Sequence, residues 1–328
     1  MKRRMLMAAV VLLAGVGIAG VGTASLAAQS STTPRTPWGD PDLQGLWTNT
    51  TTTPMERPDD LSDRETLSSE ELAARDVEVA EAVSFDNISR SNVGAYNEFW
   101  VERGALIAQT SLVVDPPDGQ LPLLTEQAQR RSEQFMARWL APPASWEDMN
   151  LYDRCITRGL PGAMIPGFYN HNYLILQTPD HVVVQVEMIH DARIIPLAGR
   201  RQAQSGIPQW LGQSQGRWEG DTLVVETAGF AAKGEQRTSL GGFFLTFSGG
   251  PGSRLVERFT RLPDGTLDYR FTVTDPTIDT REWTAAIPMR PYEEPLFEYA
   301  CHEGNYAMPN ILAGARADEA GAAGRQER

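Results

Sequence analysis

The stretch Leu255-Val-Glu-Arg-Phe-Thr-Arg-Leu-Pro-Asp-Gly-Thr-Leu-Asp-Tyr-Arg-Phe-Thr-Val-Thr274 decides the fold of this chain. Two runs rich in β-branched and aromatic residues flank Pro263-Asp-Gly265, and an Asp-Gly pair between such runs predicts a β-hairpin. Apolar and polar residues alternate along the second run, which predicts a strand with one buried face. That face carries Leu267, Tyr269, Phe271 and Val273.

The same kind of pattern continues on both sides of this hairpin. Strands are expected at 172–179, 182–190, 192–197, on both sides of a turn within 217–227, and at 255–261, 266–274, 281–289 and 296–302. No helical pattern separates these strands, which excludes a parallel βαβ fold. Because a meander must hide its edges, we expect a mainly β fold: an antiparallel meander closed or curled into a barrel.

Upstream of the meander, the sequence predicts one further strand and a helical insert. Trp47 and its threonine neighbours suit a strand, whereas residues 60–160 change character. Helices are expected from Ser68, over 125–140, and for a short turn capped by Ser145. We expect a single domain over 29–313 and a disordered tail over 314–328.

The N-terminus has the layout of a secretory signal peptide. Lys2, Arg3 and Arg4 precede an apolar run over 5–22, and small residues follow up to Ala28. Residues 1–28 are therefore expected to be cleaved, which predicts a periplasmic or secreted protein without a stable membrane anchor. An uncleaved anchor is the alternative.

Cys155 and Cys301 are the two cysteines of the chain. In an oxidising compartment such a pair predicts one disulfide that ties the middle of the chain to its end. The alternative is two buried free thiols.

Charge and missing motifs narrow the function. The formal net charge is −13 and no basic stripe is present, which disfavours binding to nucleic acid. The sequence contains no phosphate-binding loop, no HExxH zinc motif and no dinucleotide fingerprint between a strand and a helix, which disfavours nucleotide-dependent enzymes.

Four blocks of the sequence resemble a large uncharacterised family of exported bacterial proteins. They are Trp38-Gly-Asp-Pro-Asp-Leu-Gln-Gly-Leu-Trp47, Cys155-Ile-Thr-Arg-Gly-Leu-Pro-Gly162, Arg217-Trp-Glu-Gly-Asp-Thr-Leu223 and Glu298-Tyr-Ala-Cys-His-Glu-Gly-Asn305. This resemblance implies no catalytic residues. In addition, Gly45-x-Trp47 ahead of a β-meander is similar to the opening of lipocalin-like (calycin) barrels, which implies a barrel that holds a ligand. The helical insert departs from the lipocalin plan.

Polar residues gather in segments that the predicted disulfide would join. If Cys155 and Cys301 are bonded, their Cα atoms lie about 5.5 Å apart, which brings Arg154 and Arg158 towards His302. The candidate catalytic residues, as acids, bases or orienting groups, are His190, His302, Glu303 and Glu187. The candidate ligand-binding residues are Arg154, Arg158, Tyr169, Asn170, His171, Asn172, Arg193 and Asn305. For each of them a structural role is the alternative; His190 is expected to end the inward-facing stripe of its strand, at a barrel mouth.

Two functions follow from these residues. The first is an exported protein that binds a small organic molecule in the barrel cavity. The alternative is a cofactor-independent lyase, isomerase or hydrolase using His/Glu acid–base chemistry, and a structural envelope protein is a third reading. No cofactor is expected, although three histidines that converge would suit a metal, and His302 a haem. The oligomeric state is left open.

Overall fold

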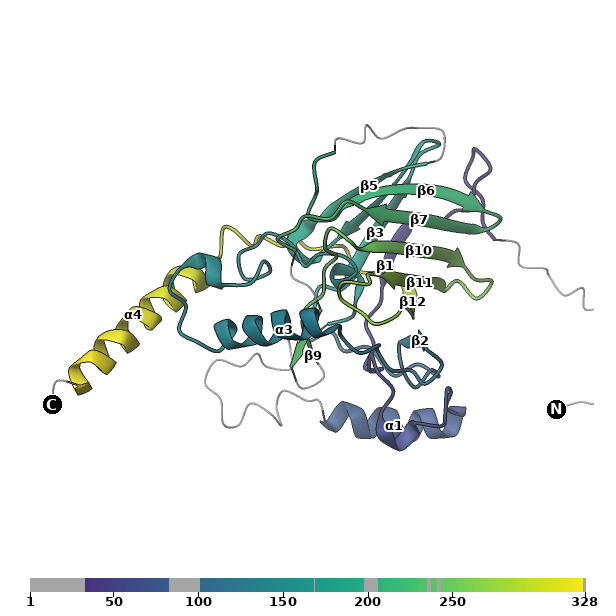
Figure 1. Ribbon diagram of the computed structural model, residues 1–328. Coiled ribbons are helices and arrows are strands. Elements are labelled where there is room, and N and C mark those ends of the chain that lie inside the picture. Colours follow the sequence, from purple (N-terminus) through teal and green to yellow (C-terminus); the bar gives the residue numbers. More distant parts are fainter. Residues whose placement is uncertain are drawn as a thin grey trace, which may run out of the picture. The chain divides into compact units, whose positions relative to one another are not determined.

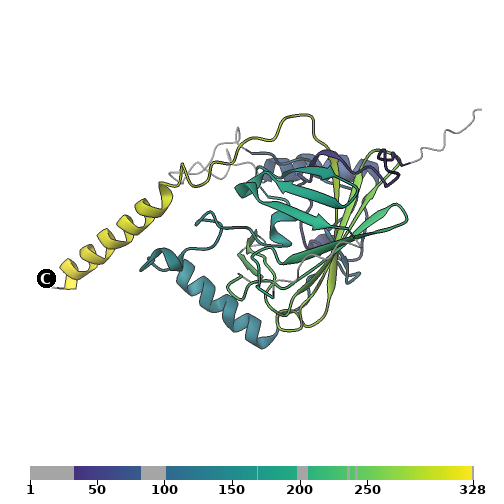
Figure 2. The same ribbon diagram turned by 90° about the horizontal axis from the view of Figure 1, so that it is seen from above.

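The computed structural model describes residues 33–82, 101–167, 169–197, 206–234, 237–240 and 243–326. The predicted signal peptide, residues 1–28, lies outside them. The described chain is mainly β, as predicted: a ten-stranded antiparallel sheet curls into a nearly closed barrel (Figure 1 and Figure 2).

The strands follow one another around the barrel in the order β5-β4-β3-β1-β12-β11-β10-β7-β6, and β2 pairs with β12. Their bounds are β1 Gly45–Thr48, β2 Val113–Asp115, β3 Asn172–Gln177, β4 His181–Val186, β5 Ala192–Pro196, β6 Gln213–Glu219, β7 Thr222–Ala228, β10 Arg254–Arg261, β11 Leu267–Thr274 and β12 Trp283–Pro291. Between β7 and β10, the short strands β8 (Thr238–Leu240) and β9 (Phe243–Thr246) form a separate hairpin.

The helices lie outside the run of strands from β3 to β12 in the sequence. They are α1 (Ser69–Ala82), α3 (Glu126–Trp139) and α4 (Ala307–Gln326), with single 3-10 turns at Asp59–Leu61, Trp146–Asp148, Gly162–Met164 and Met188–His190. The helical insert is thus confirmed, and its predicted short third helix is the turn Trp146–Asp148. The Thr125 side chain caps α3 by accepting a hydrogen bond from the amide of Ala128 at 3.2 Å.

β1 closes the meander, because it lies between the meander's first and last strands. Leu46 pairs with Leu174 of β3, and Trp47 pairs with Pro291 of β12. On the opposite side, a bridge joins Leu197 to Gly216 and so connects the β5 and β6 edges. A Cβ on Gly216 would lie 3.0 Å from the Leu197 side chain, so glycine permits this close approach.

The interior of the barrel is packed with side chains. The predicted inner face of β11 is confirmed, because Leu267, Tyr269, Phe271 and Val273 are all buried. The ring centroids of Phe259 and Tyr269 are 4.7 Å apart, and those of Phe271 and Trp283 are 5.4 Å apart in an edge-on contact. Packed aromatic rings therefore occupy the space where the sequence places a ligand.

A buried ion pair crosses the interior between β5 and β10. The Arg193 guanidinium donates two hydrogen bonds to the Glu257 carboxylate, at 2.8 and 2.5 Å, and the Tyr269 hydroxyl donates to the same carboxylate at 3.0 Å. Burial, the largest single effect, would lower the pKa of Arg193, but the charge and hydrogen bonds of Glu257, together with Tyr269, outweigh it and raise that pKa. Arg193, predicted as a ligand-binding residue, forms this buried pair.

The strand predicted over 182–190 ends at Val186. β4 and β5 pair antiparallel, with Gln185 opposite Ala192, so the residues between them must form the turn. Ile189 and His190 adopt positive φ angles of 61° and 65° there. Glycine and asparagine are the residues that usually mark such a turn in a sequence, and this turn contains neither. The prediction that His190 continues the inward-facing stripe is therefore wrong.

The chain after β12 differs from the prediction in two places. Residues 296–302 form irregular structure and a turn, where a strand was predicted. The segment 314–326, predicted to be a disordered tail, belongs to α4, whose alanine-rich sequence favours a helix. The Arg316 guanidinium donates to the carbonyl oxygens of Pro143 and Ala144 at 2.8 and 2.9 Å, which ties α4 to the segment after α3.

The predicted disulfide between Cys155 and Cys301 is present, with the two Cα atoms 5.8 Å apart. Next to it, the Asn305 side chain donates to the carbonyl oxygen of Asp153 at 2.9 Å. Such a bond persists in oxidising compartments. Across the part of the chain that the structure describes, no helix is both long and apolar enough to cross a bilayer.

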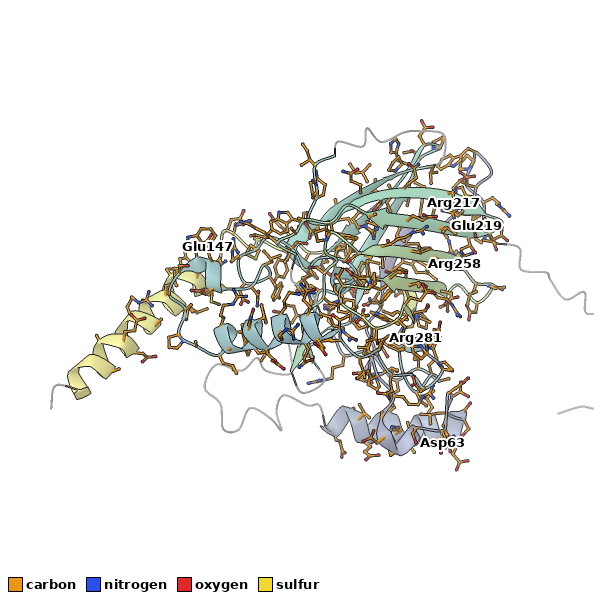
Figure 3. The ribbon with its side chains drawn as sticks, in the orientation of Figure 1. Asp63, Glu147, Arg217, Glu219, Arg258 and Arg281 are labelled. Carbon is orange, nitrogen blue, oxygen red and sulfur yellow. A yellow bond between two sulfur atoms is a disulfide. The ribbon has the colours of Figure 1, made fainter. Side chains whose placement is uncertain are left out.

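Charged side chains on the outer face of the barrel pair with one another. Figure 3 shows Arg217 and Glu219 of β6 close to Arg258 of β10, with β7 between the two strands. The Glu219 carboxylate accepts from Arg217 at 2.8 Å and from Arg258 at 2.9 Å. These three side chains therefore neutralise one another in ion pairs on the barrel surface.

Candidate functional site

A cleft with a cavity of about 560 Å³ lies outside the barrel, against α3. Three parts of the chain form it: one face of α3, the segment 146–154, and a third wall made of Trp210, Lys233, Gly234 and Arg237. The lining residues are Ala128, Arg131, Ser132, Gln134, Phe135, Arg138, Trp146, Glu147, Asp148, Met149, Leu151, Arg154, Trp210, Lys233, Gly234 and Arg237.

The face of α3 that lines the cleft carries cations. Arg131, Phe135 and Arg138 are spaced by three and four residues, so they lie on one side of the helix. Arg131 donates to the carbonyl oxygen of Thr277 at 3.0 Å, which holds its guanidinium in place. Arg138 is exposed at the other end of this face. The helix therefore presents two positive charges and one aromatic ring to the cavity.

The second wall begins at a capped turn. Ser145 accepts a hydrogen bond from the amide of Glu147 at 3.2 Å, and Asp148 accepts from the amide of Ser145 at 3.0 Å. The Asp148 carboxylate is thus hydrogen-bonded to backbone amides. The Arg154 guanidinium lies over the ring of Trp146, 4.6 Å from its centroid, so the cation and the ring face the cleft as a stacked pair.

The third wall combines an exposed rim with a buried floor. Lys233 is exposed, and Trp210 is about one-third exposed. Beneath them, Arg237 is buried and forms an ion pair with Asp279 at 2.9 Å. Burial lowers the pKa of Arg237, and the nearby carboxylates oppose this effect. Arg237 therefore belongs to the floor of the cleft and is neutralised there.

The cleft is positively charged on an acidic protein. It contains five cationic and two acidic side chains, whereas the whole chain has a net charge of −13. In the described ranges no ion pair links Arg131, Arg138, Arg154 or Lys233 to a carboxylate. Figure 3 places Glu147, at the rim, far from the ion pairs of Arg217, Glu219 and Arg258. Four of the five cationic side chains of the cleft thus have no ion-pair partner among the described residues.

Of the residues predicted to bind a ligand, Arg154 lies in this cleft. Asn305 contacts the wall from behind, through Asp153 and the sulfur of Cys155. Arg158 does not line the cleft. Its guanidinium lies 5.3 Å from the centroid of the Tyr152 ring, and its Nη1 is 3.1 Å from Nε2 of His171. The disulfide therefore brings only part of the predicted set to one place.

Tyr169, Asn170 and His171 lie just before β3, and Tyr169 belongs to a cluster of three tyrosines. The hydroxyl of Tyr152 is 3.4 Å from that of Tyr169 and 3.2 Å from that of Tyr299. Asn170 has a positive φ of 55°. His171 is buried, and this burial, aided by the charge of Arg158, lowers its pKa well below the usual range. A neutral, buried imidazole of this kind is suited to packing.

Glu187 and Asn172 form a buried polar contact together with Glu102. The side-chain amide of Asn172 donates to Glu187 at 2.7 Å and to Glu102 at 3.2 Å, and the Phe297 amide donates to Glu187 at 2.9 Å. Burial raises the pKa of Glu102, and the Glu187 carboxylate raises it further. Glu187, predicted as a catalytic group, thus has its oxygens engaged inside the fold.

We predict that Glu102→Gln stabilises the protein at neutral pH. A carboxyl group whose pKa is raised in the folded state holds its proton more tightly there than in the unfolded chain. Stability is therefore present at low pH and is lost as the pH rises from the ordinary glutamate value of about 4.3 towards the raised one. Urea denaturation across pH should show a decline in the wild type that is weaker in the variant. The exposed Glu303→Gln is the matched control, and parallel pH profiles for Glu102→Gln and wild type would refute the prediction.

His190, His302 and Glu303 are exposed and lie on turns. Nε2 of His190 is 3.1 Å from the side-chain nitrogen of Gln185, and no hydrogen bond or ion pair in the described chain joins the three residues. No group of three or more His, Cys, Asp or Glu residues within the described ranges is arranged to hold a metal ion. Within the described ranges, His190, His302 and Glu303 therefore do not share one site.

Sequence reasoning missed most of the cleft, although two signals were present. Arg131 and Arg138 are seven residues apart on a predicted helix, a spacing that places them on one face. Lys233 is the single lysine after the predicted signal peptide. Nothing in the sequence, however, indicates that α3 and the loop around Trp210 face the same space.

Comparison of the chain with known protein families, with curated proteins and with solved structures finds no match. The resemblances to exported bacterial proteins and to lipocalin-like barrels stay predictions.

Proposed function

We propose that this protein binds a small organic anion in the cationic cleft beside α3. The observation that carries the proposal is the gathering of Arg131, Arg138, Arg154 and Lys233 around one cavity without carboxylate partners in the described chain. Guanidinium groups hold carboxylate, sulfonate or phosphate groups through charge-assisted hydrogen bonds. An anion would supply the charge that the walls lack.

The size and the aromatic lining of the cleft favour an organic ligand over a bare inorganic ion. A cavity of about 560 Å³ is within the usual range for small-molecule sites. Trp146, Trp210 and Phe135 present rings to it, and a planar ligand gains from stacking on such rings. The proposal keeps the small organic partner expected from the sequence but places it outside the barrel, since packed side chains occupy the interior.

We propose in addition that the protein is exported, either to the periplasm or out of the cell. It is supported by the basic and apolar N-terminal sequence and by the disulfide, which needs an oxidising compartment to persist. Nucleic acid remains an unsuitable partner, because the net negative charge of the chain repels its phosphates.

Benzoate and benzamide provide the test, because they have the same shape and differ in charge. Calorimetric titration should show binding of benzoate that weakens with added salt, and little binding of benzamide. Arg138→Gln should weaken benzoate binding about tenfold, the loss of one charged hydrogen bond of about 1.5 kcal/mol.

Arg130→Gln is the matched control for this experiment. Arg130 is the neighbour of Arg131 on the same helix, is paired with Glu126 at 3.5 Å and does not line the cleft. Its replacement changes the net charge equally and should leave benzoate binding intact. Equal binding of benzoate and benzamide, or equal losses in Arg130→Gln and Arg138→Gln, would overturn the proposal.

A further inference from the structure

A second hollow adjoins the cationic cleft. Its volume is about 330 Å³, and its lining is Ile207, Pro208, Gln209, Trp210, Ala231, Ala232 and Lys233. Trp210 and Lys233 also line the cleft, so these two side chains stand at the junction of the two spaces.

The chemistry of the second hollow differs from that of the cleft. Apart from Gln209 and Lys233 its lining side chains are apolar. Ile207 is a large apolar side chain that is 63% exposed at this place. The lining has no acidic side chain. An apolar group would therefore be accommodated here, whereas the cleft suits a charged one.

The backbone around the hollow is held by hydrogen bonds. The Gln209 amide donates to the carbonyl oxygen of Gly229 at 3.0 Å, and the Ala231 amide donates to the carbonyl oxygen of Gln209 at 2.8 Å. Phe230 is buried beneath them. A hollow with such a frame exists before a ligand arrives, which lowers the cost of binding.

We infer that the ligand is an amphipathic anion, an alkyl or aryl carboxylate or a related acid. Its anionic group lies among the cations of the cleft, and its apolar part passes Trp210 into the adjoining hollow. This inference rests on the proposed function and adds the class of ligand to it. Lys233, at the junction, is placed to pair with the anionic group while its methylene stem lies along the apolar part.

A series of straight-chain carboxylates tests the inference on the full chain. Titration with acetate, butanoate, hexanoate and octanoate should show an affinity that rises with length, by up to about three- to fourfold for each methylene buried. Hexanamide, which lacks the charge, should bind much more weakly than hexanoate.

Two variants separate the two ends of the ligand. Ile207→Gln should reduce the gain with chain length and leave butanoate binding nearly unchanged. Arg138→Gln should weaken all the carboxylates by a similar factor and preserve the gain with length. Ile194→Gln is the matched control, since Ile194 on β5 is 62% exposed and lies outside both spaces.

The outcomes separate this inference from the proposed function. Charge-dependent binding without any gain with chain length, or a gain unchanged in Ile207→Gln, overturns the inference and leaves the anion site standing. Equal affinities for hexanoate and hexanamide overturn the anion site and the inference together, as does the absence of binding by every carboxylate.

Discussion

Arg193→Met is expected to lower the free energy of unfolding by about 3–5 kcal/mol, the usual cost of removing one partner from a buried ion pair. The variant keeps an unbranched, flexible side chain that is shorter than arginine, and removes its charge. Glu257, which is fully buried, would then face the barrel interior with only the Tyr269 hydroxyl as a donor among its present partners. Arg193 also donates to the hydroxyl of Ser214 at 3.3 Å, so the contact between β5 and β6 is weakened as well.

Urea denaturation measures this loss, and a second variant keeps the test informative. Arg193→Met combined with Glu257→Leu should recover most of the stability, because an apolar pair of similar volume is often as stable as a buried ion pair. Arg258→Gln, on the outer face of the neighbouring position of β10, should have little effect because solvent screens its pair with Glu219. An unchanged denaturation midpoint in Arg193→Met would show that the pair does not support the barrel.

Removing the disulfide is the second change with a large expected effect. The bond joins residues 146 positions apart, and the loop-entropy estimate for a closure of this length is up to about 5 kcal/mol. Cys155→Ser combined with Cys301→Ser should lower the denaturation midpoint accordingly. We also expect weaker benzoate binding, because Arg154 and Trp146 lie on the wall that this bond holds.

Reductant provides the control for the disulfide prediction. It should destabilise the wild type to the level of the double serine variant and leave that variant unchanged. A wild type whose midpoint does not respond to complete reduction, verified by thiol titration, would contradict the prediction.

The strands were predictable wherever the alternation of apolar and polar residues in the sequence matches the burial of the strand in the folded barrel. In β11 the alternation of apolar and polar residues reports directly which face is buried, because side chains on a strand point to opposite sides in turn. The Asp-Gly turn before it follows from backbone preference alone. The cysteine pair was predictable for a similar reason, since two cysteines in a chain that is expected to be exported allow a single connection.

The predictions failed where distant contacts override local preference. Val182 to His190 looks like one strand, but its antiparallel partner β5 forces a turn after Val186. The contact between Arg193 and Glu257 was not predicted, because the two residues are 64 positions apart and only the curling of the sheet into a barrel brings them together. Short-range patterns contain no information about which buried charge meets which.

The amino-acid sequence alone determined a mainly β barrel, a helical insert and a disulfide. The alternation of apolar and polar residues and the turn residues depend only on near neighbours in the sequence, and two cysteines can form only one disulfide. The tertiary structure alone decided that the barrel interior is packed and that the cations of α3, Arg154 and Lys233 surround one cleft. Those side chains come from segments up to about a hundred residues apart, and their meeting depends on how helix, loop and barrel pack.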